Sequence, residues 1–279
     1  LTPLGPSPRP NGTTYYPRTL GGHEDLAFLR DARTRRECVL FTGPPGTGKT
    51  AVAEAAFFPD ATDDHPGMMT LTYTADTNEA DQLGTYVQDP ATGRYLWQYG
   101  PLALSVIYDV PFCADEVLLA DPRMLSVLYG LMDGRGVLRI ALNPALPPLT
   151  VGANWFVIGT GNPDVPGAVM SEALLDRFHH HVEVGTDWAL ARQLGVLAPL
   201  VAVAERLDAR RRDGEVSWSP QMRSLLSFRD AHTYFGLPYA LGNLLRKTPA
   251  EDRPVVEDEL NQVPMLKGAA ATELGPRHA

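Results

Sequence analysis

The feature that most constrains the fold is a glycine-rich stretch, GPPGTGKT, at residues 43–50. It fits the pattern G-x-x-x-x-G-K-[ST] of a phosphate-binding loop. An apolar run at residues 38–41 precedes it and a helix-prone, alanine-rich run at residues 51–56 follows it. The sequence therefore predicts a strand that leads into the loop and a helix that leaves it. Glycines let successive N–H groups face an anion, and the helix N-terminus adds its positive dipole end. A glycine-rich turn that matches by chance is the weaker interpretation, because the flanking strand and helix lie where this chemistry needs them.

The pattern assigns roles to individual residues of the loop. Lys49 is predicted to reach the outer phosphates, and the hydroxyl of Thr50 to ligate Mg²⁺. The chain has 24 lysines and arginines, of which only Lys49, Lys247 and Lys267 are lysines, so composition does not explain a lysine at this position. The nucleotide-binding residues predicted here are Gly43, Pro44, Pro45, Gly46, Thr47, Gly48, Lys49, Thr50 and Ala51.

Composition narrows the class of protein. The formal net charge of −9 argues against a general nucleic-acid binder, although it leaves room for a local basic patch. Cys38 and Cys113 fall in predicted buried strands, which favours core thiols in a reducing compartment over a disulfide framework. No apolar run approaches the ~18 residues of a membrane span, and no signal peptide is visible. We therefore expect a cytoplasmic protein without a membrane span.

Apolar runs at residues 38–42, 68–73, 106–114, 155–160 and 181–184 alternate with helical segments, the first helix ending near residue 36. This alternation predicts a parallel sheet covered by helices on both faces, a three-layer α/β/α nucleotide-binding core at about residues 20–185. Two β-hairpin insertions are expected near residues 86–99 and 135–154.

The ends of the chain differ from this core. Residues 1–19 are proline-rich and predict an extended N-terminal arm, either loose or lying on a neighbouring subunit. Helical patterns at residues 187–212, 220–235, 237–247 and 252–262 predict a small all-helical domain over residues 186–263. Residues 264–279 show little periodicity and are expected to form a C-terminal tail.

Polar residues follow two of the predicted core strands. Asp115 and Glu116 end the run at 106–114, and Asn162 ends the next one. The carboxyl ends of parallel strands meet at one edge of the sheet, where ligands bind. Asp115 is predicted to hold Mg²⁺, Glu116 to orient and deprotonate the attacking water, and Asn162 to contact the γ-phosphate or that water. Solvated acids at a strand end and an Asn-Pro turn are the structural alternatives.

A short capped helical turn, SEALLDRF at residues 171–178, contains a further candidate. Ser171 is a typical N-cap residue. Arg177 is either a surface arginine paired with Asp176 or a group that reaches a neighbouring subunit's γ-phosphate.

The order of these motifs resembles that of AAA+ ATPases, most of all the MoxR type (dynein-related, CbbQ-, NirQ- and GvpN-like). GPL at residues 100–102 resembles a MoxR element upstream of the acidic strand. Residues 121–125 and 131–135 resemble the helix that follows the acidic pair, and NP at 162–163 with SEALLDRF resembles the run after it. The resemblance covers about residues 20–185 well and the helical region poorly.

The resemblance implies ATP with Mg²⁺ as cofactors and an α/β domain followed by a helical lid. It implies that Asn162 is the first sensor and Arg177 an arginine finger acting in trans, hence a homo-oligomeric ring, usually of six subunits. The two hairpins correspond to insertions that line a pore or face the substrate. Arg223 is the candidate lid sensor, although it lies two positions later than in relatives, and His23 is expected near the adenine.

Other residues favour structural roles. The consecutive residues His179, His180 and His181 would point to alternate faces of a strand, which excludes convergence on one metal ion. Arg210, Arg211 and Arg212 suit a solvated helix end. Tyr95, Trp97 and Tyr99 are spaced as hairpin residues, either as pore aromatics or packed side chains.

Three functions remain open at the level of sequence. The first is an ATPase that remodels a client protein, together with a von Willebrand A-domain partner as MoxR-type ATPases commonly do. The second is a nucleotide-gated assembly or regulatory module with little turnover, which the shifted position of Arg223 favours. The third, a nucleic-acid-directed ATPase, is disfavoured by net charge.

Overall fold

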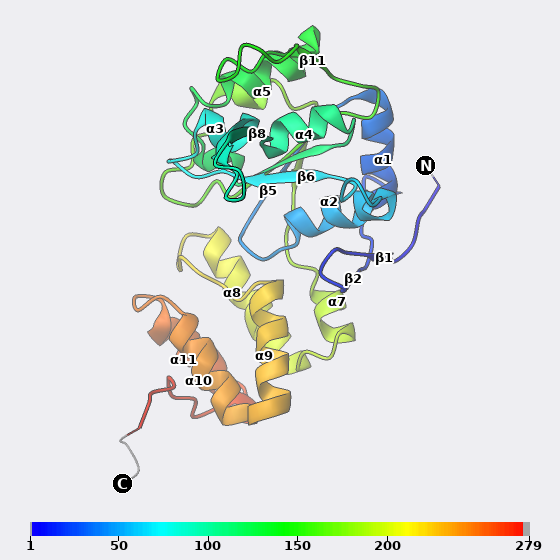
Figure 1. Ribbon diagram of the computed structural model, residues 1–279. Coiled ribbons are helices and arrows are strands. Elements are labelled where there is room, and N and C mark those ends of the chain that lie inside the picture. The colour runs from blue at the N-terminus through cyan, green and yellow to red at the C-terminus, as the bar shows by residue number, and fades with distance from the viewer. Residues whose placement is uncertain (1, 276–279) are drawn as a thin grey trace. The chain divides into compact units, whose positions relative to one another are not determined.

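The computed structural model describes residues 2–275, which form two compact units (Figure 1). The first unit contains the described residues up to Gly43 together with Lys49–Val184. The second contains Pro44–Gly48 and the described residues from Gly185 onward. Most of the phosphate loop is thus grouped with the helical part of the chain, although it connects a strand and a helix of the first unit.

A five-stranded parallel sheet forms the centre of the first unit. Its strands are β5 (Val39–Thr42), β6 (Met69–Thr72), β9 (Phe112–Asp115), β12 (Val157–Gly161) and β13 (His180–Glu183), in the order β13-β5-β12-β9-β6. Thr72 lies opposite Asp115 in the register, and Gly161 lies opposite Thr42. The parallel sheet predicted from the apolar runs is confirmed, and its carboxyl ends meet at one edge.

Helices cover both faces of this sheet because successive strand residues point to opposite sides. Leu40 packs with Leu102, Leu118 and Phe178 on one face. Val39 and Phe41 pack on the other face with residues of α1 (Asp25–Arg35) and α2 (Lys49–Phe57), where the core residues are Leu26, Leu29, Val52 and Phe57. The three-layer α/β/α core is therefore confirmed.

The remaining short helices of the first unit follow the sheet. They are α3 (Glu79–Leu83), α4 (Pro101–Ile107), α5 (Ser126–Gly130) and α6 (Glu172–Leu175), with single helical turns at Phe58–Asp60 and Val117–Leu119 and a π-type turn at Leu131–Arg135.

One predicted strand is wrong in its first half. Residues 106–107 of the apolar run 106–114 end helix α4, and strand β9 begins only at Phe112. Pro101 sits in the first turn of α4, and the buried side chains of Leu102 and Val106 are four residues apart, which places them on one helix face. The backbone then turns at Asp109, whose φ of 52° lies in the left-handed region.

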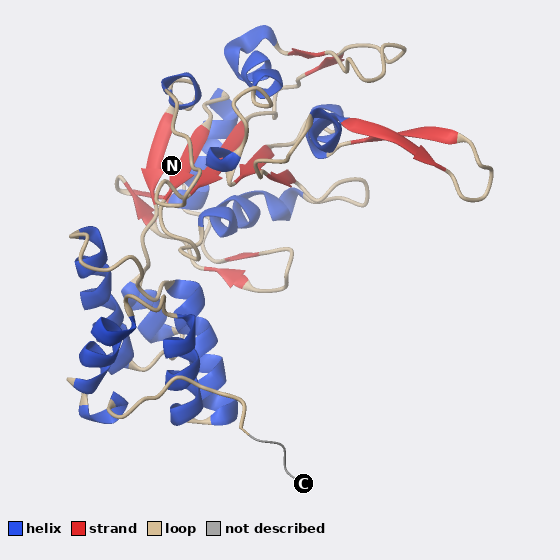
Figure 2. Ribbon diagram, turned by 90° about the vertical axis from the view of Figure 1, so that its left-hand side faces the viewer, coloured by secondary structure: helices blue, strands red, loops and turns tan. Residues whose placement is uncertain are grey.

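Both predicted hairpin insertions form. The first pairs β7 (Gly84–Gln88) with β8 (Tyr95–Tyr99), and Figure 2 shows it as a twisted ribbon that projects from its unit. The second pairs the short strands β10 (Val137–Leu138) and β11 (Leu149–Thr150).

The N-terminal arm packs on its own chain, which corrects the first of the two expectations, a loose arm. It forms β1 (Ser7–Pro8), β2 (Thr14–Tyr15) and β3 (Thr19–Leu20), the last paired with β4 (His23–Glu24). The Ser7 hydroxyl donates to the Ala55 carbonyl of α2 at 2.7 Å, and Arg9 forms an ion pair with Glu54 at 2.6 Å. These contacts require the folded α2 surface, so the arm's own proline-rich composition could not reveal them.

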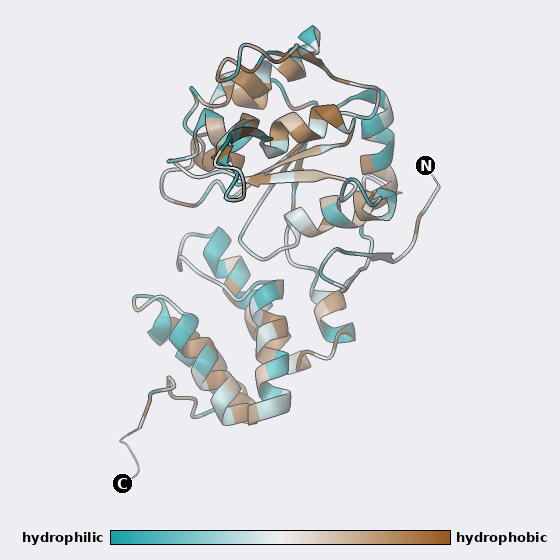
Figure 3. Cartoon of the chain, in the orientation of Figure 1, coloured by the Kyte–Doolittle hydropathy of each residue, from teal (hydrophilic) through white to brown (hydrophobic). Residues whose placement is uncertain are grey.

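The second unit is helical, as predicted. Its helices are α7 (Trp188–Gln193), α8 (Ala198–Arg212), α9 (Met222–Phe235), α10 (Leu237–Lys247) and α11 (Arg253–Asn261). Residues 187–212 form two helices instead of the single one expected, because Gly195 adopts a φ of 86° between them. Figure 3 shows apolar and polar residues interspersed along these helices, and the apolar ones form one core.

The segment after α11 is more ordered than its sequence indicates. Pro264–Leu266 forms a helical turn with Leu266 buried, and the Thr272 N–H donates to the Gly242 carbonyl at 3.2 Å. Residues 276–279 of the predicted tail lie outside the described residues. None of the helices within residues 2–275 has the length and apolarity needed to cross a membrane.

Candidate functional site

The phosphate loop has the backbone that the sequence predicts. Gly43, Gly46 and Gly48 all have positive φ, at 139°, 80° and 99°. A side chain on Gly43 would lie 2.4 Å from the Val184 carbonyl oxygen, so only glycine fits there. The Thr47 hydroxyl donates to the Pro44 carbonyl at 3.0 Å, which closes the loop on itself. The shape of the loop therefore depends on glycines at positive φ and, at Gly43, on the close approach of Val184.

Lys49 is buried at the start of α2, with only 5% of its surface exposed. Its Nζ donates to the Gly43 carbonyl oxygen at 2.8 Å, so its side chain turns back to the first residue of the loop. A buried ammonium group needs such partners. Its position at the base of the loop is the one expected for a lysine that binds phosphate.

The two predicted Mg²⁺ ligands are in direct contact. The Thr50 hydroxyl donates to one carboxylate oxygen of Asp115 at 2.8 Å, although the residues come from α2 and β9. Two further hydroxyls donate to the same carboxylate, that of Thr160 at 2.6 Å and that of Thr72 at 3.2 Å. Hydroxyl and carboxylate oxygens are hard ligands of the kind that Mg²⁺ binds. The donor set therefore fits this ion.

Glu116 follows Asp115 in an unusual backbone conformation. Its φ is 53°, in the left-handed region that non-glycine residues rarely adopt. Its N–H donates to the Thr160 hydroxyl at 3.2 Å. Backbone strain of this kind concentrates at functional sites. Thr160 thus contacts both acidic residues, through the carboxylate of one and the amide of the other.

Asn162 lies directly after β12, whose neighbours in the sheet are β5 and β9. It is 95% buried, and its side-chain oxygen accepts the N–H of Asp164 at 3.1 Å. This hydrogen bond is the one expected of an asparagine that starts a turn. Asn162 therefore lies after the strand where a sensor was predicted. Its hydrogen bond to Asp164 is the one expected of the alternative, an asparagine that starts a turn.

Arg177 is paired with Asp133, a partner that the sequence did not suggest. The ion pair is 3.0 Å long, and the guanidinium also lies 4.3 Å from the centre of the Tyr129 ring. The Ser171 hydroxyl accepts the Leu174 N–H, as predicted for an N-cap. The pairing of Arg177 with Asp176 is not the contact found.

Arg223 lies at the phosphate loop. Its N–H donates to the Gly46 carbonyl at 3.2 Å, and a side chain built on Gly46 would come within 2.8 Å of the Arg223 Cβ. The close approach explains why a glycine is needed at the centre of the loop. Within the second unit, the start of α9 is thus in van der Waals contact with the loop.

His23 is exposed on β4 and is not among the residues that line the nearest cavity. That cavity, of about 120 Å³, is bounded by the arm, by α1 and α2 and by β5 and β13; its lining includes Tyr15, Arg18, Val52, Phe41 and Val184. The Tyr15 hydroxyl donates to the buried Asp25 at 2.6 Å. Burial raises the pKa of both side chains above their ordinary values.

The histidines at 179 and 180 and the aromatic residues of the first hairpin make ordinary structural contacts. His180 contacts Glu37 at 2.9 Å and His179 accepts the Cys38 N–H at 3.0 Å, and residues 2–275 contain no cluster of metal-ligating side chains. Tyr95 is 66% exposed, whereas Trp97 packs against the core.

Sequence reasoning missed Thr160, Thr72 and Asp133. The first two stand near the carboxyl ends of their strands, a position that could have drawn attention to them. Asp133 gives no comparable signal, because its partner is 44 residues away in the chain.

Comparisons with known proteins address the family. The profile of the AAA domain (dynein-related subfamily) matches residues 38–178, about half of the chain. No curated protein matches. Among solved structures, one of a "putative ATPase" from Cytophaga hutchinsonii is similar, with 16% identity, a TM-score of 0.45, and coverage of 82% of this chain and 78% of that one. The matched residues contain the phosphate loop, the Asp-Glu strand end, Asn162 and Arg177, and on the extent of this match the chain belongs to the AAA domain family, in its dynein-related subfamily.

Proposed function

We propose that the protein is a MoxR-type AAA+ ATPase that binds ATP with Mg²⁺, hydrolyses it, and uses the cycle to remodel a client protein. The contact between Thr50 and Asp115 carries this proposal. It places a hydroxyl and a carboxylate 2.8 Å apart at the start of the helix that follows a phosphate loop. We further propose that residues 20–185 are the nucleotide-binding domain and residues 186–263 its lid.

The proposed chemistry assigns one task to each residue. The N–H groups of the loop and the ammonium of Lys49 would bind phosphate oxygens. Thr50 and Asp115 would hold Mg²⁺, which supplies Lewis-acid stabilisation of charge on the phosphates. Glu116 would orient and deprotonate the attacking water, and Asn162 would hold the γ-phosphate or that water. Arg223, whose backbone N–H bonds the loop, would be the lid sensor. His23 would lie near the adenine.

A ring is proposed because the ion pair of Arg177 is with Asp133 and its ring contact with Tyr129, neither of which belongs to the phosphate loop. In a homo-oligomer, usually a hexamer, Arg177 would stabilise the transition state in a neighbour's site. The pair with Asp133 and the face of Tyr129 support this role, since they order a long side chain before it meets a phosphate.

The projecting β7–β8 hairpin supports a protein client or a von Willebrand A-domain partner. Tyr86, Tyr95 and Leu96 on this hairpin are 50%, 66% and 57% exposed. Several large apolar side chains exposed together mark interaction surfaces more often than isolated ones do.

The deciding experiment compares the wild type with Glu116→Gln. The wild type should bind ATP and release phosphate, whereas the variant should bind ATP with similar affinity and release phosphate at least a hundredfold more slowly. Glu251→Gln, which removes an exposed carboxylate from the second unit, is the matched control and should behave as the wild type.

Three other outcomes separate the alternatives. A wild type that binds ATP but releases no phosphate, with or without candidate clients, would favour the regulatory module. Stimulation by duplex DNA or RNA would favour the nucleic-acid-directed ATPase. A wild type that does not bind ATP would refute the proposal.

A further inference from the structure

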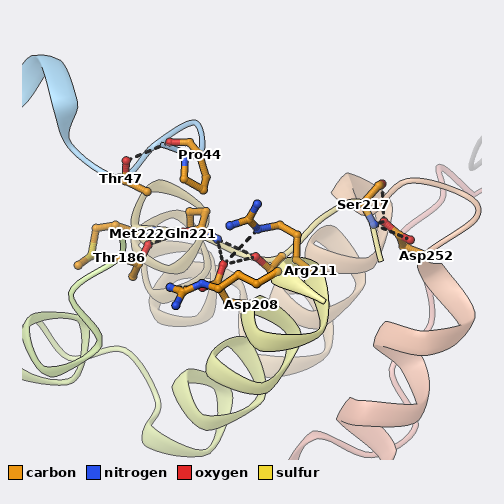
Figure 4. A network of polar contacts seen from close by, with 11 residues as sticks. Pro44, Thr47, Thr186, Asp208, Arg211, Ser217, Gln221, Met222 and Asp252 are labelled. Atoms are coloured by element: carbon orange, nitrogen blue, oxygen red, sulfur yellow. Dashed lines mark hydrogen bonds and ion pairs between the residues drawn. The ribbon is translucent and has the colours of Figure 1, made fainter. Parts of the chain in front are cut away.

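A buried carboxylate organises the polar groups that precede α9. Asp208, on α8, is 96% buried. It accepts a hydrogen bond from the Gln221 amide nitrogen at 2.8 Å (Figure 4). It also accepts one from the Ser219 hydroxyl at 3.0 Å, and Gln221 donates to Ser219 at 2.6 Å. Two of the three residues before α9, Ser219 and Gln221, are thereby bonded to α8.

The same network continues to the first residues of α9. The Gln221 side-chain oxygen accepts the Thr186 hydroxyl at 2.7 Å, and that hydroxyl accepts the Met222 N–H at 3.1 Å. The next N–H, that of Arg223, donates to the Gly46 carbonyl of the phosphate loop at 3.2 Å. Hydrogen bonds therefore link Asp208 to the Met222 N–H, and the peptide that joins Met222 to Arg223 connects this series to the hydrogen bond with Gly46.

The charge of Asp208 is balanced locally. Arg211 and Arg212 lie 3.2 Å and 2.9 Å from its two oxygens. Burial raises the pKa of Asp208, but hydrogen bonds from Gln221 and Ser219 and the two arginines outweigh it and hold the pKa below its ordinary range. The group is therefore a carboxylate at neutral pH, able to accept all of these bonds.

We propose that Asp208 is a positioning residue for ATP hydrolysis, which fixes Gln221 and Thr186 so that the start of α9, and with it Arg223, lies against the phosphate loop. The inference rests on the proposed function of that loop. The contact is close, since a side chain built on Gly46 would lie 2.8 Å from the Arg223 Cβ. A displacement of about 1 Å in a catalytic site can cost on the order of a hundredfold in rate.

A second buried aspartate in the same unit supplies a matched control. Asp252 is 95% buried and accepts bonds from the Ser217 N–H and hydroxyl at 3.0 Å and 2.7 Å, as Figure 4 also shows. No hydrogen bond of the network described above involves it. Asp208→Asn and Asp252→Asn therefore remove the same charge at the same burial, and only the first perturbs Gln221.

The test measures three properties of each variant: the midpoint of thermal unfolding, hydrogen exchange of the Met222 and Arg223 amides without nucleotide, and kcat and KM for ATP. Asp208→Asn should increase amide exchange at these two positions and lower kcat about tenfold or more. Asp252→Asn should lower the unfolding midpoint but leave amide exchange and kcat within about twofold of wild type. Thr186→Val should reproduce Asp208→Asn, and Thr186→Ser, which keeps the hydroxyl, should restore most of the rate.

The results of these measurements support or overturn the positioning role of Asp208. Equal effects of the two aspartate variants on exchange and kcat, or a Thr186→Val variant with wild-type kcat, would overturn the positioning role. If the wild type fails to hydrolyse ATP, the proposed function itself falls and this inference falls with it. The exchange measurement then still reports whether Asp208 holds the start of α9, so the two failures are distinguishable.

Discussion

Replacing Thr160 by valine removes the hydroxyl that contacts Asp115 and Glu116 and preserves the shape of the side chain. Thr160 is fully buried, so the valine methyl takes the place of the hydroxyl without opening a cavity. Its hydroxyl donates to Asp115 at 2.6 Å and accepts the Glu116 N–H at 3.2 Å. The substitution therefore affects both acidic residues at once.

The size of the effect follows from these two bonds. A hydrogen bond to a charged group contributes about 1.5–3 kcal/mol. Since 1.36 kcal/mol corresponds to a tenfold change in rate, full loss of the bond to Asp115 in the transition state lowers kcat roughly 10- to 150-fold. The Glu116 N–H also loses its acceptor, which adds about 1–3 kcal/mol of destabilisation where that amide stays buried.

The assay is phosphate release at saturating ATP over a titration of Mg²⁺, with thermal unfolding measured alongside. Thr72→Val is the control, because its hydroxyl bonds the same carboxylate at 3.2 Å from an exposed edge of the sheet. Its kcat should change less than about threefold, as expected for a solvated hydrogen bond. A Thr160→Val variant that folds and keeps kcat within twofold of wild type would refute the reasoning.

The remaining predictions concern other parts of the molecule. Arg177→Ala should lower kcat about 10³-fold and leave ATP affinity nearly unchanged, whereas Arg135→Ala, a 73% exposed side chain near the same Asp133, should not; equal rates for the two would contradict the finger assignment. Burial raises the pKa of Cys38 to about 11 and raises that of Cys113 as well, so a thiol reagent at pH 8 should label neither in the native protein and both in urea. The pKa of Asp208 is lower in the folded state than the unfolded value of about 3.9, so its charge stabilises the fold above that pH and the stabilisation is lost as the pH falls through the folded value. The difference in unfolding free energy between wild type and Asp208→Asn should accordingly shrink below about pH 4 in urea titrations, and a pH-independent difference would be evidence against this assignment.

Most of the fold could be predicted from short runs of apolar residues. The apolar runs that became β5 and β12 predicted a buried parallel sheet, because strands covered on both faces need apolar residues at consecutive positions. The strand predicted at 106–114 was wrong in its first part, because Val106 fits an apolar strand and an amphipathic helix equally well. Only the packing of α4 decides between the two.

The sequence by itself also determined the phosphate loop and the pair Asp115–Glu116. Glycine's lack of a side chain permits the positive φ of Gly43, Gly46 and Gly48, and a carboxylate at the end of a parallel strand has only one edge of the sheet to occupy. Such features depend on neighbours within a few residues, so they can be predicted from short segments.

Only the tertiary structure decided what these groups contact. Three contacts join residues between 44 and 177 positions apart in the chain: Thr160 with Asp115, Asp133 with Arg177, and Gly46 with Arg223. Many side chains of the same type could fill each of these partner positions, and nothing local distinguishes them. The choice is made when the sheet and the helices pack, because packing sets which buried polar atoms come within 3 Å and must satisfy one another.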